Sequence, residues 1–553
     1  MAAPPSARVK FMPSVFFLLA ALAWLLYNSP CHHKTPPTPP SVSPFNWHPC
    51  AENPLVECGT LLVRLNHLAP ENGTFIKLAL SRFRPNTTEP VLGSLLINPG
   101  GPGGSGKQVV LLGGKRLSSM VGDRYDIIGF DPRGIGESNS IKCLNLLSCI
   151  LRINVGVTTF AKLQEAKAKS CGKWGIDVLP YVSTASVARD MDLIREALGE
   201  DVLNYYGFSY GTFLGTVYSQ MFPDRVGRLA IDGVMDATTY VKSYAEFSLQ
   251  YLINTDDIYK GFVKDCEAAG PSRCALASSD LKKHPVDKKV RSLLKSLEKD
   301  PVVVVEDITF PTIIGATEVL NLLFRGWYQP AIWPKIATAL ASLIDENDAT
   351  AVAQLSSGGG GPSGDTCPIH DEAGSLGFLS VVCLDTAGND HPLKKWEKIA
   401  KENTKNSEWF GEANTWQGLA CKYWPVSASE RYTGPWNNKL KNQILIIGNR
   451  YDPVTPLASA QIIEKQMEGN GVLLTREGYG HCSTSMVSKC TQEHIRRYFV
   501  DGIVPPKGTV CDTDFDVFPE TNLLDAQSAE VLKNVEDIQM IHEMIVKSNV
   551  RRL

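Results

Sequence analysis

The chain has 553 residues, of which 43% are hydrophobic and 20% charged, as expected for a folded globular protein with one large domain or two to three smaller ones. Its formal net charge is −3. Nucleic-acid-binding domains usually carry a basic excess, so this balance argues against a nucleic acid partner.

The first 30 residues look like a targeting segment. Arg8 and Lys10 precede the apolar run Phe11–Tyr27, which is typical of a signal for the secretory pathway. The run is intermediate in length between a signal-peptide core and a bilayer span, so a cleaved peptide and a retained membrane anchor both stay open for residues 1–30. In either case the positive flank predicts a lumenal or extracellular protein body. The Pro-rich residues 31–49 predict a tether.

Fourteen cysteines suit an oxidising compartment, and no C-x-x-C pair suggests a zinc or redox site. Short spacings favour loop-closing disulfides, although spacing does not fix connectivity. The pairs with such spacings are Cys50 with Cys58, Cys266 with Cys274, and Cys490 with Cys511. Two sequons, at Asn72 and Asn86, are candidate glycosylation sites in the same compartment.

Residues 50–236 alternate apolar strands with helical segments. Strands are predicted at Gly59–Leu65, Phe75–Phe83, Gly93–Gly100, Tyr125–Asp131, the segment ending at Gly207, and Leu229–Val234. A helix beginning at Ser183 or Thr184 has apolar residues on one face. Strands that are apolar on both faces and alternate with helices indicate a mostly parallel sheet covered by helices.

The pattern changes over residues 237–440. Helices are predicted at Tyr240–Tyr259, Lys288–Leu297 and Thr317–Phe324, and a flexible loop at Ser356–Gly364. We expect this part to be a cap or lid inserted into the sheet. Strands at Asn442–Asn449 and Gly471–Thr475 then continue the sheet within residues 441–515. In the tail, residues 516–553, the apolar spacing over Leu523–Val546 predicts a helix docked on the core.

The stretch NYYGFSYGTFLG, Asn204–Gly215, holds Ser209 in the pattern G-x-S-x-G. A chain with 45 glycines can produce this pattern by chance. Here, however, a predicted strand precedes Ser209 and a helical segment follows it. A serine on such a strand-to-helix turn has its hydroxyl lifted above the sheet, which favours a nucleophile over a chance glycine turn.

A serine nucleophile needs a histidine base, and that histidine needs a carboxylate that fixes its tautomer. Asp452 follows a predicted strand in GNRYDPVTP, and His481 lies in the glycine-bracketed loop EGYGHCS. The alternatives are an Asp-Pro turn and a structural histidine. We predict the catalytic triad Ser209, Asp452 and His481.

The glycine-rich segment INPGGPGGSG, Ile97–Gly106, directly follows a strand and could supply the backbone N–H groups of an oxyanion hole. We assign Gly101 together with Tyr210, with Gly100 as the nearest competitor. The segment has neither the P-loop nor the dinucleotide-binding pattern. We therefore predict no nucleotide, other cofactor or metal.

Four features together resemble the α/β-hydrolase peptidases of the proline iminopeptidase and tripeptidyl aminopeptidase group. They are NPGGPGGSG, FDPRGIGES (Phe130–Ser138), GFSYGT, and RYDPVTP paired with GYGHCS. The resemblance implies an α/β-hydrolase fold with a mainly helical cap, and an exopeptidase that forms an acyl-enzyme on Ser209. Proline iminopeptidases usually have His before the paired glycines, where this chain has Pro99, so the tripeptidyl branch matches better.

The leading hypothesis is a serine aminopeptidase that acts on peptides with free N-termini. An esterase or lipase on the same scaffold is the first alternative, with small esters as substrates, because fold alone does not fix substrate. A non-catalytic surface binding protein is the second, and the apparent triad argues against it. Cap carboxylates would have to hold a substrate ammonium, and the sequence singles out none among Glu246, Asp256 and Asp257.

Overall fold

The computed structural model describes residues 44–69, 71, 73–141, 156–308, 311–357, 375–514, 516–520 and 540–545. The apolar run Phe11–Tyr27, the sequon at Asn72, and residues 358–364 of the predicted loop lie outside these ranges. Within them, no helix combines the length and the apolar character needed to cross a bilayer.

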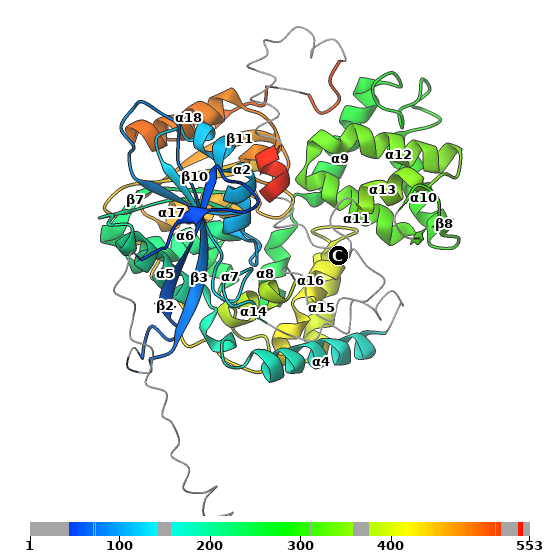
Figure 1. Ribbon diagram of the computed structural model, residues 1–553. Helices are drawn as coiled ribbons and strands as arrows, with labels where there is room; N and C mark the ends of the chain where they lie inside the picture. The colour runs from blue at the N-terminus through cyan, green and yellow to red at the C-terminus, as the bar shows by residue number, and fades with distance from the viewer. Residues whose placement is uncertain are drawn as a thin grey trace, which may run out of the picture. The chain divides into compact units, whose positions relative to one another are not determined.

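A ten-stranded sheet forms the centre of the fold, in the order β1-β2-β3-β5-β4-β6-β7-β10-β11-β12 (Figure 1). The strands are β1 (His48–Pro49), β2 (Val56–Arg64), β3 (Phe75–Phe83), β4 (Ser94–Asn98), β5 (Asp126–Phe130), β6 (Leu203–Phe208), β7 (Val226–Asp232), β10 (Ile444–Tyr451), β11 (Gly471–Tyr479) and β12 (Val510–Cys511). From β5 to β12 every neighbouring pair is parallel, whereas β1, β2 and β3 pair in antiparallel fashion. The predicted mostly parallel sheet is confirmed.

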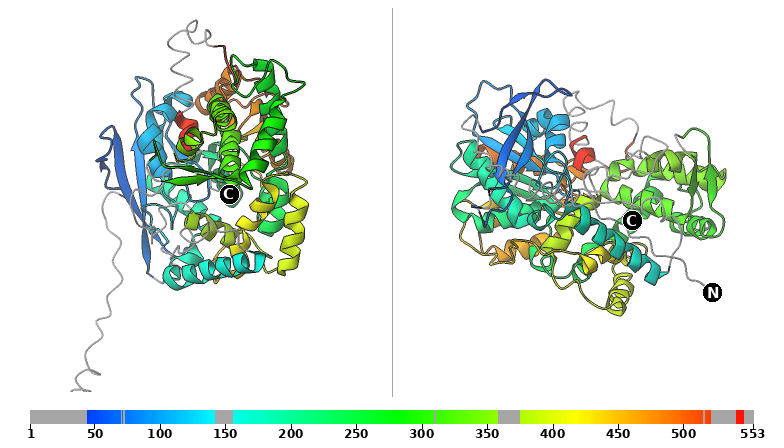
Figure 2. Two further views of the ribbon diagram at one scale, coloured as in Figure 1. Left: turned by 90° about the vertical axis from the view of Figure 1, so that its right-hand side faces the viewer. Right: turned by 60° about the horizontal axis from the view of Figure 1, so that its bottom comes forward.

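The central strands are buried because helices cover both faces of the sheet. Every residue of β4 (SLLIN) and β6 (LNYYGF) is buried. One face packs on α2 (Gly106–Met120) and α18 (Lys489–Asp501), and the other on α5 (Thr184–Ala197), α6 (Tyr210–Met221) and α17 (Leu457–Gln466). Figure 2 shows these layers from two further sides.

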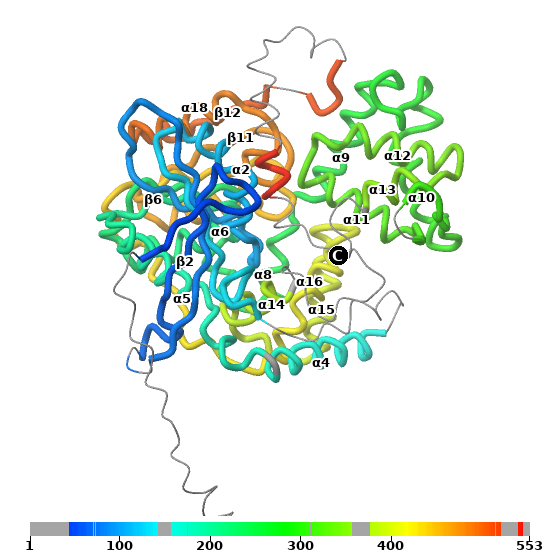
Figure 3. The backbone as a smooth tube through the Cα atoms, viewed as in Figure 1, coloured from blue at the N-terminus to red at the C-terminus, as the bar shows by residue number. Residues whose placement is uncertain are grey.

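A mainly helical segment separates β7 from β10 in the sequence, although the two strands are hydrogen-bonded neighbours. Its helices are α7 (Ala237–Tyr240), α8 (Tyr244–Tyr251), α9 (Thr255–Ala269), α10 (Val286–Leu297), α11 (Ala316–Tyr328), α12 (Trp333–Asp345), α13 (Thr350–Ser357), α14 (Ser375–Asp385), α15 (Leu393–Asn403) and α16 (Gly411–Gln417). Two short antiparallel strands, β8 (Val302–Val304) and β9 (Thr312–Ile314), lie between α10 and α11 in the sequence. Helices α9 to α13 lie together in the fold (Figure 3). They contribute most of one apolar cluster, which includes Trp327 and Trp333.

The single helix predicted at Tyr240–Tyr259 is wrong, because the chain forms α8 and α9 with a break at Leu252–Asn254. The amide of Thr255 donates to the carbonyl oxygen of Leu252, and its hydroxyl donates to the carbonyl oxygen of Pro453 at 3.2 Å. This polar anchor begins a new helix beside the Asp452 loop. A hydrophobicity pattern cannot show an anchor of that kind.

All three predicted disulfides are present: Cys50–Cys58, Cys266–Cys274 and Cys490–Cys511. A fourth, Cys383–Cys421, joins α14 to the short helix η5 (Leu419–Tyr423), over a separation too long for spacing to suggest. Disulfides such as these are typical of extracellular or secreted proteins.

Within the tail, the described residues 540–545 are helical. Ile541, Met544 and Ile545 are buried in the same apolar cluster as α2 and α18. For these residues, the predicted helix docked on the core is confirmed.

Candidate active site

Ser209 occupies the turn between β6 and α6, with φ 56° and ψ −124°. A residue with a side chain rarely adopts such backbone angles, and they cluster at functional sites. The flanking glycines are needed because other backbone comes close. A Cβ on Gly207 would overlap the carbonyl oxygen of Gly211, and one on Gly211 would lie 2.7 Å from that of Asn98. The G-x-S-x-G pattern thus has a steric basis in this turn.

Hydrogen bonds hold the turn in this strained form. The amide of Ser209 donates to the carbonyl oxygen of Asp232 at 3.0 Å. Thr212 donates both its amide, at 2.8 Å, and its hydroxyl, at 2.5 Å, to the carbonyl oxygen of Ser209. The Ser209 residue is only 6% exposed. The turn is therefore fixed at the carboxyl end of the sheet, where α/β proteins place their ligands.

Asp452 and His481 are both fully buried and hydrogen-bonded to each other. Nδ1 of His481 lies 3.0 Å from each carboxylate oxygen of Asp452. The amides of Val454 and Thr455 also donate to the carboxylate, at 3.0 and 2.8 Å. Burial opposes ionisation, but His481 and these amides outweigh it and hold the pKa of Asp452 below its usual value. An ionised Asp452 fixes the tautomer of His481 with its hydrogen on Nδ1.

Nε2 of His481 faces away from Asp452 and is buried. It makes no hydrogen bond to Ser209 or to any other residue in the described ranges. Ser209 and His481 nevertheless both lie close to the Asp232–Gly233 peptide. The carbonyl oxygen of Asp232 accepts the Ser209 amide, and a Cβ on Gly233 would be 3.3 Å from Cε1 of His481. The structure thus joins Asp452 to His481 directly and brings the His481 ring beside the Ser209 turn.

Asp232 is a second buried carboxylate, which sequence reasoning missed. Its side chain accepts the Ser483 amide at 2.8 Å, the Ser483 hydroxyl at 2.5 Å and the Tyr206 hydroxyl at 3.1 Å. Complete burial raises its pKa, although these donors counter the effect. Since the Asp232 backbone holds Ser209, this residue braces both the serine turn and the histidine loop. Its only sequence signal is an acid at the end of a buried strand.

Arg476 is a second missed residue, buried completely under the histidine loop. It donates to the side chain of Asn449 at 2.9 Å, the carbonyl oxygen of Tyr479 at 3.0 Å and the hydroxyl of Ser485 at 2.8 Å. Burial lowers its pKa to about 10. Sequence reasoning treated the strand as apolar up to Thr475 and gave this arginine no role.

The glycine-rich loop after β4 lies against the serine turn. Gly100, Gly101 and Gly103 have φ values of 97°, 109° and 106°, which favour glycine. Gly100 donates its amide to the side chain of Asn98 at 2.9 Å. Tyr210 is the first residue of α6, and the first amides of a helix have no partner within it. The predicted oxyanion donors therefore come from two segments that pack together at Asn98 and Gly211.

The helical insertion contacts the histidine loop through Tyr328, the last residue of α11. The amide of His481 donates to the carbonyl oxygen of Tyr328 at 3.1 Å, and the two rings meet edge to face with centroids 5.0 Å apart. Trp333 packs on Tyr479 in the same region, with centroids 5.1 Å apart. The insertion is thus a direct neighbour of the candidate base.

The three acids considered as ammonium anchors make other contacts. Glu246 pairs with Lys395 at 3.1 Å, and Asp257 with Lys260 at 3.0 Å. Asp256 accepts the backbone amide of Glu408 at 3.1 Å. These contacts explain the positions of all three without a substrate.

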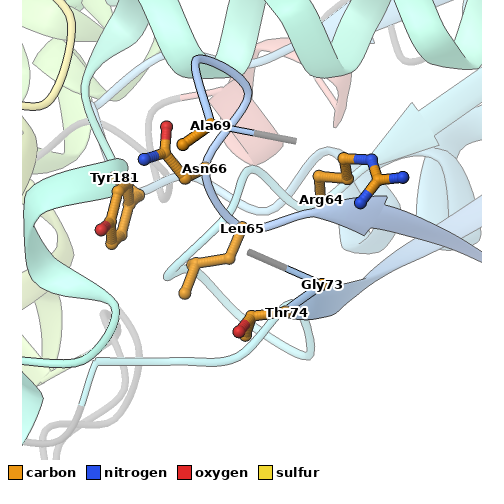
Figure 4. A pocket seen from close by; sticks show the side chains of 7 residues that line it. All are labelled: Arg64, Leu65, Asn66, Ala69, Gly73, Thr74 and Tyr181. Carbon is orange, nitrogen blue, oxygen red and sulfur yellow. The ribbon is translucent and has the colours of Figure 1, made fainter. Parts of the chain in front are cut away.

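Other candidate sites lie apart from Ser209. Cys490, His494 and Cys511 are close together, but Cys490 and Cys511 form a disulfide and offer no thiolate to a metal. Figure 4 shows a hollow of about 60 Å³, lined by Arg64, Leu65, Asn66, Ala69, Gly73, Thr74 and Tyr181. A larger hollow lies beside α10. Neither is lined by Ser209, Asp452 or His481.

Two family models match the sequence: one described as alpha/beta hydrolase fold over residues 93–302, and one described as TAP-like protein over residues 407–511. Among curated proteins, serine protease Hip1 of Mycobacterium tuberculosis is 28% identical over 85% of this chain and 91% of its own. Tripeptidyl aminopeptidase of Streptomyces lividans is 26% identical over 84% and 86%. Carboxylesterase B of M. tuberculosis is 27% identical over 86% and 92%.

The sheet order and the family matches establish an α/β-hydrolase fold with a large helical insertion. The relatives named as a serine protease and an aminopeptidase confirm the predicted resemblance to the α/β-hydrolase peptidase group. The protein is therefore a serine hydrolase.

Proposed function

We propose that the protein is a serine aminopeptidase that releases short peptides or single residues from free N-termini. The observation that carries the proposal is the buried Asp452–His481 pair beside the strained Ser209 turn. Relatives named serine protease Hip1 and tripeptidyl aminopeptidase, each similar over most of the chain, support a peptide substrate.

In the proposed mechanism, Oγ of Ser209 attacks the scissile carbonyl carbon while Nε2 of His481 takes the hydroxyl proton. The ionised Asp452 stabilises the resulting imidazolium. In this proposal the amides of Gly101 and Tyr210 stabilise the oxyanion of the tetrahedral intermediate. His481 then gives its proton to the leaving amine, which leaves an acyl-enzyme on Ser209. A water molecule, deprotonated by His481, releases the acyl group and restores the serine.

The contacts of the helical insertion support an exopeptidase. Tyr328 and Trp333 bring two insertion elements against the histidine loop, so a substrate at Ser209 has these elements as neighbours. In our proposal the insertion limits how much peptide fits on the acyl side of the scissile bond. Such a limit would confine cleavage to the first residues of a chain.

One observation supports the esterase alternative: the similarity to carboxylesterase B. Esters and amides use the same nucleophile, base and oxyanion donors, so the substrate must be tested directly. The non-catalytic alternative explains neither the strained serine nor the buried Asp–His pair.

The test compares chromogenic amides of one, two and three residues, with free and acetylated N-termini, against short p-nitrophenyl esters. We expect hydrolysis of the free amides. Acetylation should lower kcat/KM by at least about tenfold, because it removes the ammonium and leaves its partner in the protein unpaired, which costs about 1.4 kcal/mol or more. Hydrolysis of the esters alone, or indifference to acetylation, would contradict the aminopeptidase proposal. Ser209→Ala serves as the control for background hydrolysis.

We also propose that the chain enters the secretory pathway through residues 1–30 and carries a glycan on Asn86, which is exposed. The disulfides support this route. Removal of N-glycans from protein made in a secreting eukaryotic host should increase its gel mobility, and Asn86→Gln should reduce that change. The same mobility with and without treatment would contradict glycosylation. Detergent-free release of the protein would decide against a retained anchor.

A further inference from the structure

His542 lies in the short C-terminal helix and is buried beside the histidine loop, with only 1% of its surface exposed. Its Nε2 is 2.9 Å from the carbonyl oxygen of Tyr328, and its Nδ1 is 3.0 Å from the hydroxyl of Thr484. A carbonyl oxygen can only accept, so Nε2 carries the hydrogen. Nδ1 is then the acceptor, and the Thr484 hydroxyl donates to it. Both hydrogen bonds of the ring are satisfied in a single tautomer.

Two histidines share one acceptor. The Tyr328 carbonyl that accepts from His542 also accepts the backbone amide of His481. Thr484 lies three positions after His481, in the same loop. His542 thus holds the candidate base from two sides, through Tyr328 of the insertion and through Thr484 of the loop. Three segments that are far apart in the sequence meet at this ring.

The helix that carries His542 fits closely into the core. Ile541, Met544 and Ile545 join the apolar cluster that includes α2. On α2, a Cβ at Gly113 would overlap the side chain of Met544, so the glycine makes room for the tail. Glu543, the next residue along the chain, is exposed. This pattern places His542 on the buried face of a docked helix.

The ring remains neutral in this position. Burial, followed by the nearby His481, lowers the pKa of His542 to about 3. A neutral ring adds no positive charge beside the candidate base. It can also keep the Nε2–H donor and the Nδ1 acceptor that its two partners require.

We propose that His542 is a positioning residue for His481, so that the C-terminal helix forms part of the catalytic apparatus. The proposal rests on the proposed function, because it requires His481 to act as the base. His542 touches no reacting atom. It fixes the Tyr328 carbonyl and the Thr484 hydroxyl, and these set the place of the His481 backbone and ring.

The test uses three variants of the full-length protein. His542→Leu removes the donor and the acceptor, whereas His542→Gln can still donate an N–H to Tyr328. Glu543→Gln is the matched control on the exposed side of the same turn. For each we would measure the labelling rate of Ser209 by a fluorophosphonate, kcat and KM on a peptide amide, and the melting temperature.

We expect His542→Leu to lower kcat and the labelling rate together by about tenfold, which corresponds to about 1.4 kcal/mol, because both hydrogen bonds that position the histidine loop are lost. KM should change less than about twofold, because the residue makes no substrate contact. His542→Gln should recover most of both rates, and Glu543→Gln should match the unmodified protein. A fall in melting temperature with unchanged rates would show a purely structural role and overturn the proposal.

Thr484→Val provides an independent variant if His542→Leu does not fold. It removes the hydroxyl that donates to Nδ1 and should lower the labelling rate about threefold with unchanged KM. An unchanged labelling rate in Thr484→Val would overturn the proposal. Labelling that survives Ser209→Ala would instead refute the proposed function, so the two failures are distinct.

Discussion

The serine turn and the histidine loop reach the same end of the sheet by different means. The serine turn is set by local sterics, because Gly207 and Gly211 let neighbouring backbone come close and Ser209 takes a strained conformation. The histidine loop is set by buried polar contacts, to Asp452 and Asp232 from distant segments and to Arg476 from the strand that leads into the loop. A short stretch of sequence therefore determines the serine turn, whereas contacts in the tertiary structure determine the histidine loop.

The largest effect should come from the Asp452–His481 pair, which defines the histidine side. Asp452→Asn keeps the shape but removes the charge and favours the wrong tautomer of His481. We expect kcat on a peptide amide to fall by about 10⁴-fold. The measurement is steady-state kinetics at pH 7. A loss below about tenfold would show that Asp452 only shapes the loop.

The Asp232 carboxylate holds the histidine loop at Ser483 and the strand before Ser209 at Tyr206, so loss of this side chain should affect catalysis. Asp232→Ala leaves the Ser483 amide and hydroxyl and the Tyr206 hydroxyl without their buried acceptor. We expect kcat to fall about 100-fold with little change in KM, since such unsatisfied groups cost about 1–3 kcal/mol each. Circular dichroism and gel filtration would establish that the variant is folded. A change confined to KM would place Asp232 in substrate binding instead.

The steric origin of the serine turn can be tested at Gly211. In Gly211→Ala, the new Cβ would lie 2.7 Å from the carbonyl oxygen of Asn98, which is backbone and cannot rotate away. We expect a loss of about 2 kcal/mol in the free energy of unfolding, as for other overpacked sites. Chemical denaturation measures it. The exposed Gly156→Ala, at φ −61° and with no neighbouring atom, controls for the replacement of a glycine that is not at positive φ. Equal losses in both variants would contradict the steric account.

A pH effect should arise where the insertion meets the serine side. Asp385, at the end of α14, accepts the amide and the hydroxyl of Thr184 at 2.8 and 2.6 Å, and Thr184 also contacts the Tyr210 hydroxyl. Burial raises the pKa of Asp385 from 3.8 to about 7. Between these values the folded protein binds the extra proton, so stability falls as pH rises through this window.

Replacement of this carboxyl should remove that dependence. In Asp385→Asn, the free energy of unfolding should fall less between pH 4 and pH 7 than in the unmodified protein, as measured by denaturant titration at several pH values. Identical slopes in both proteins would show that Asp385 does not titrate in this range.

The smallest effect is expected at Glu246, in the insertion. Its carboxylate pairs with Lys395 at the surface, and such pairs contribute about 0–1 kcal/mol. Glu246→Gln should therefore leave kcat/KM for free and acetylated peptide amides unchanged. A selective loss on the free amides would make Glu246 the ammonium anchor and revise our view of the insertion.

Sequence reasoning recovered the parts of the molecule that local pattern determines. The apolar runs at Phe75–Phe83 and Gly471–Thr475 became β3 and the start of β11. The strand before Ser209 and the helical segment after it predicted the turn. The pairing of Asp452 with His481 followed from chemistry and order along the chain. These features depend on short stretches or on a mechanism with fixed requirements.

The remaining features depend on contacts between distant residues. Asp232, Arg476 and His542 are polar residues on buried elements, and only the tertiary structure shows which groups they satisfy. The break between α8 and α9 likewise comes from the contact of Thr255 with Pro453. No periodicity in the sequence encodes such partners.

The central claim is that Ser209 is a nucleophile activated by His481. Peptide mapping by mass spectrometry after fluorophosphonate labelling of the full-length protein tests it directly. We predict a single adduct on Ser209, lost in Ser209→Ala and formed at least about 100-fold more slowly in His481→Ala. An adduct on another serine, or undiminished labelling in either variant, would contradict the account.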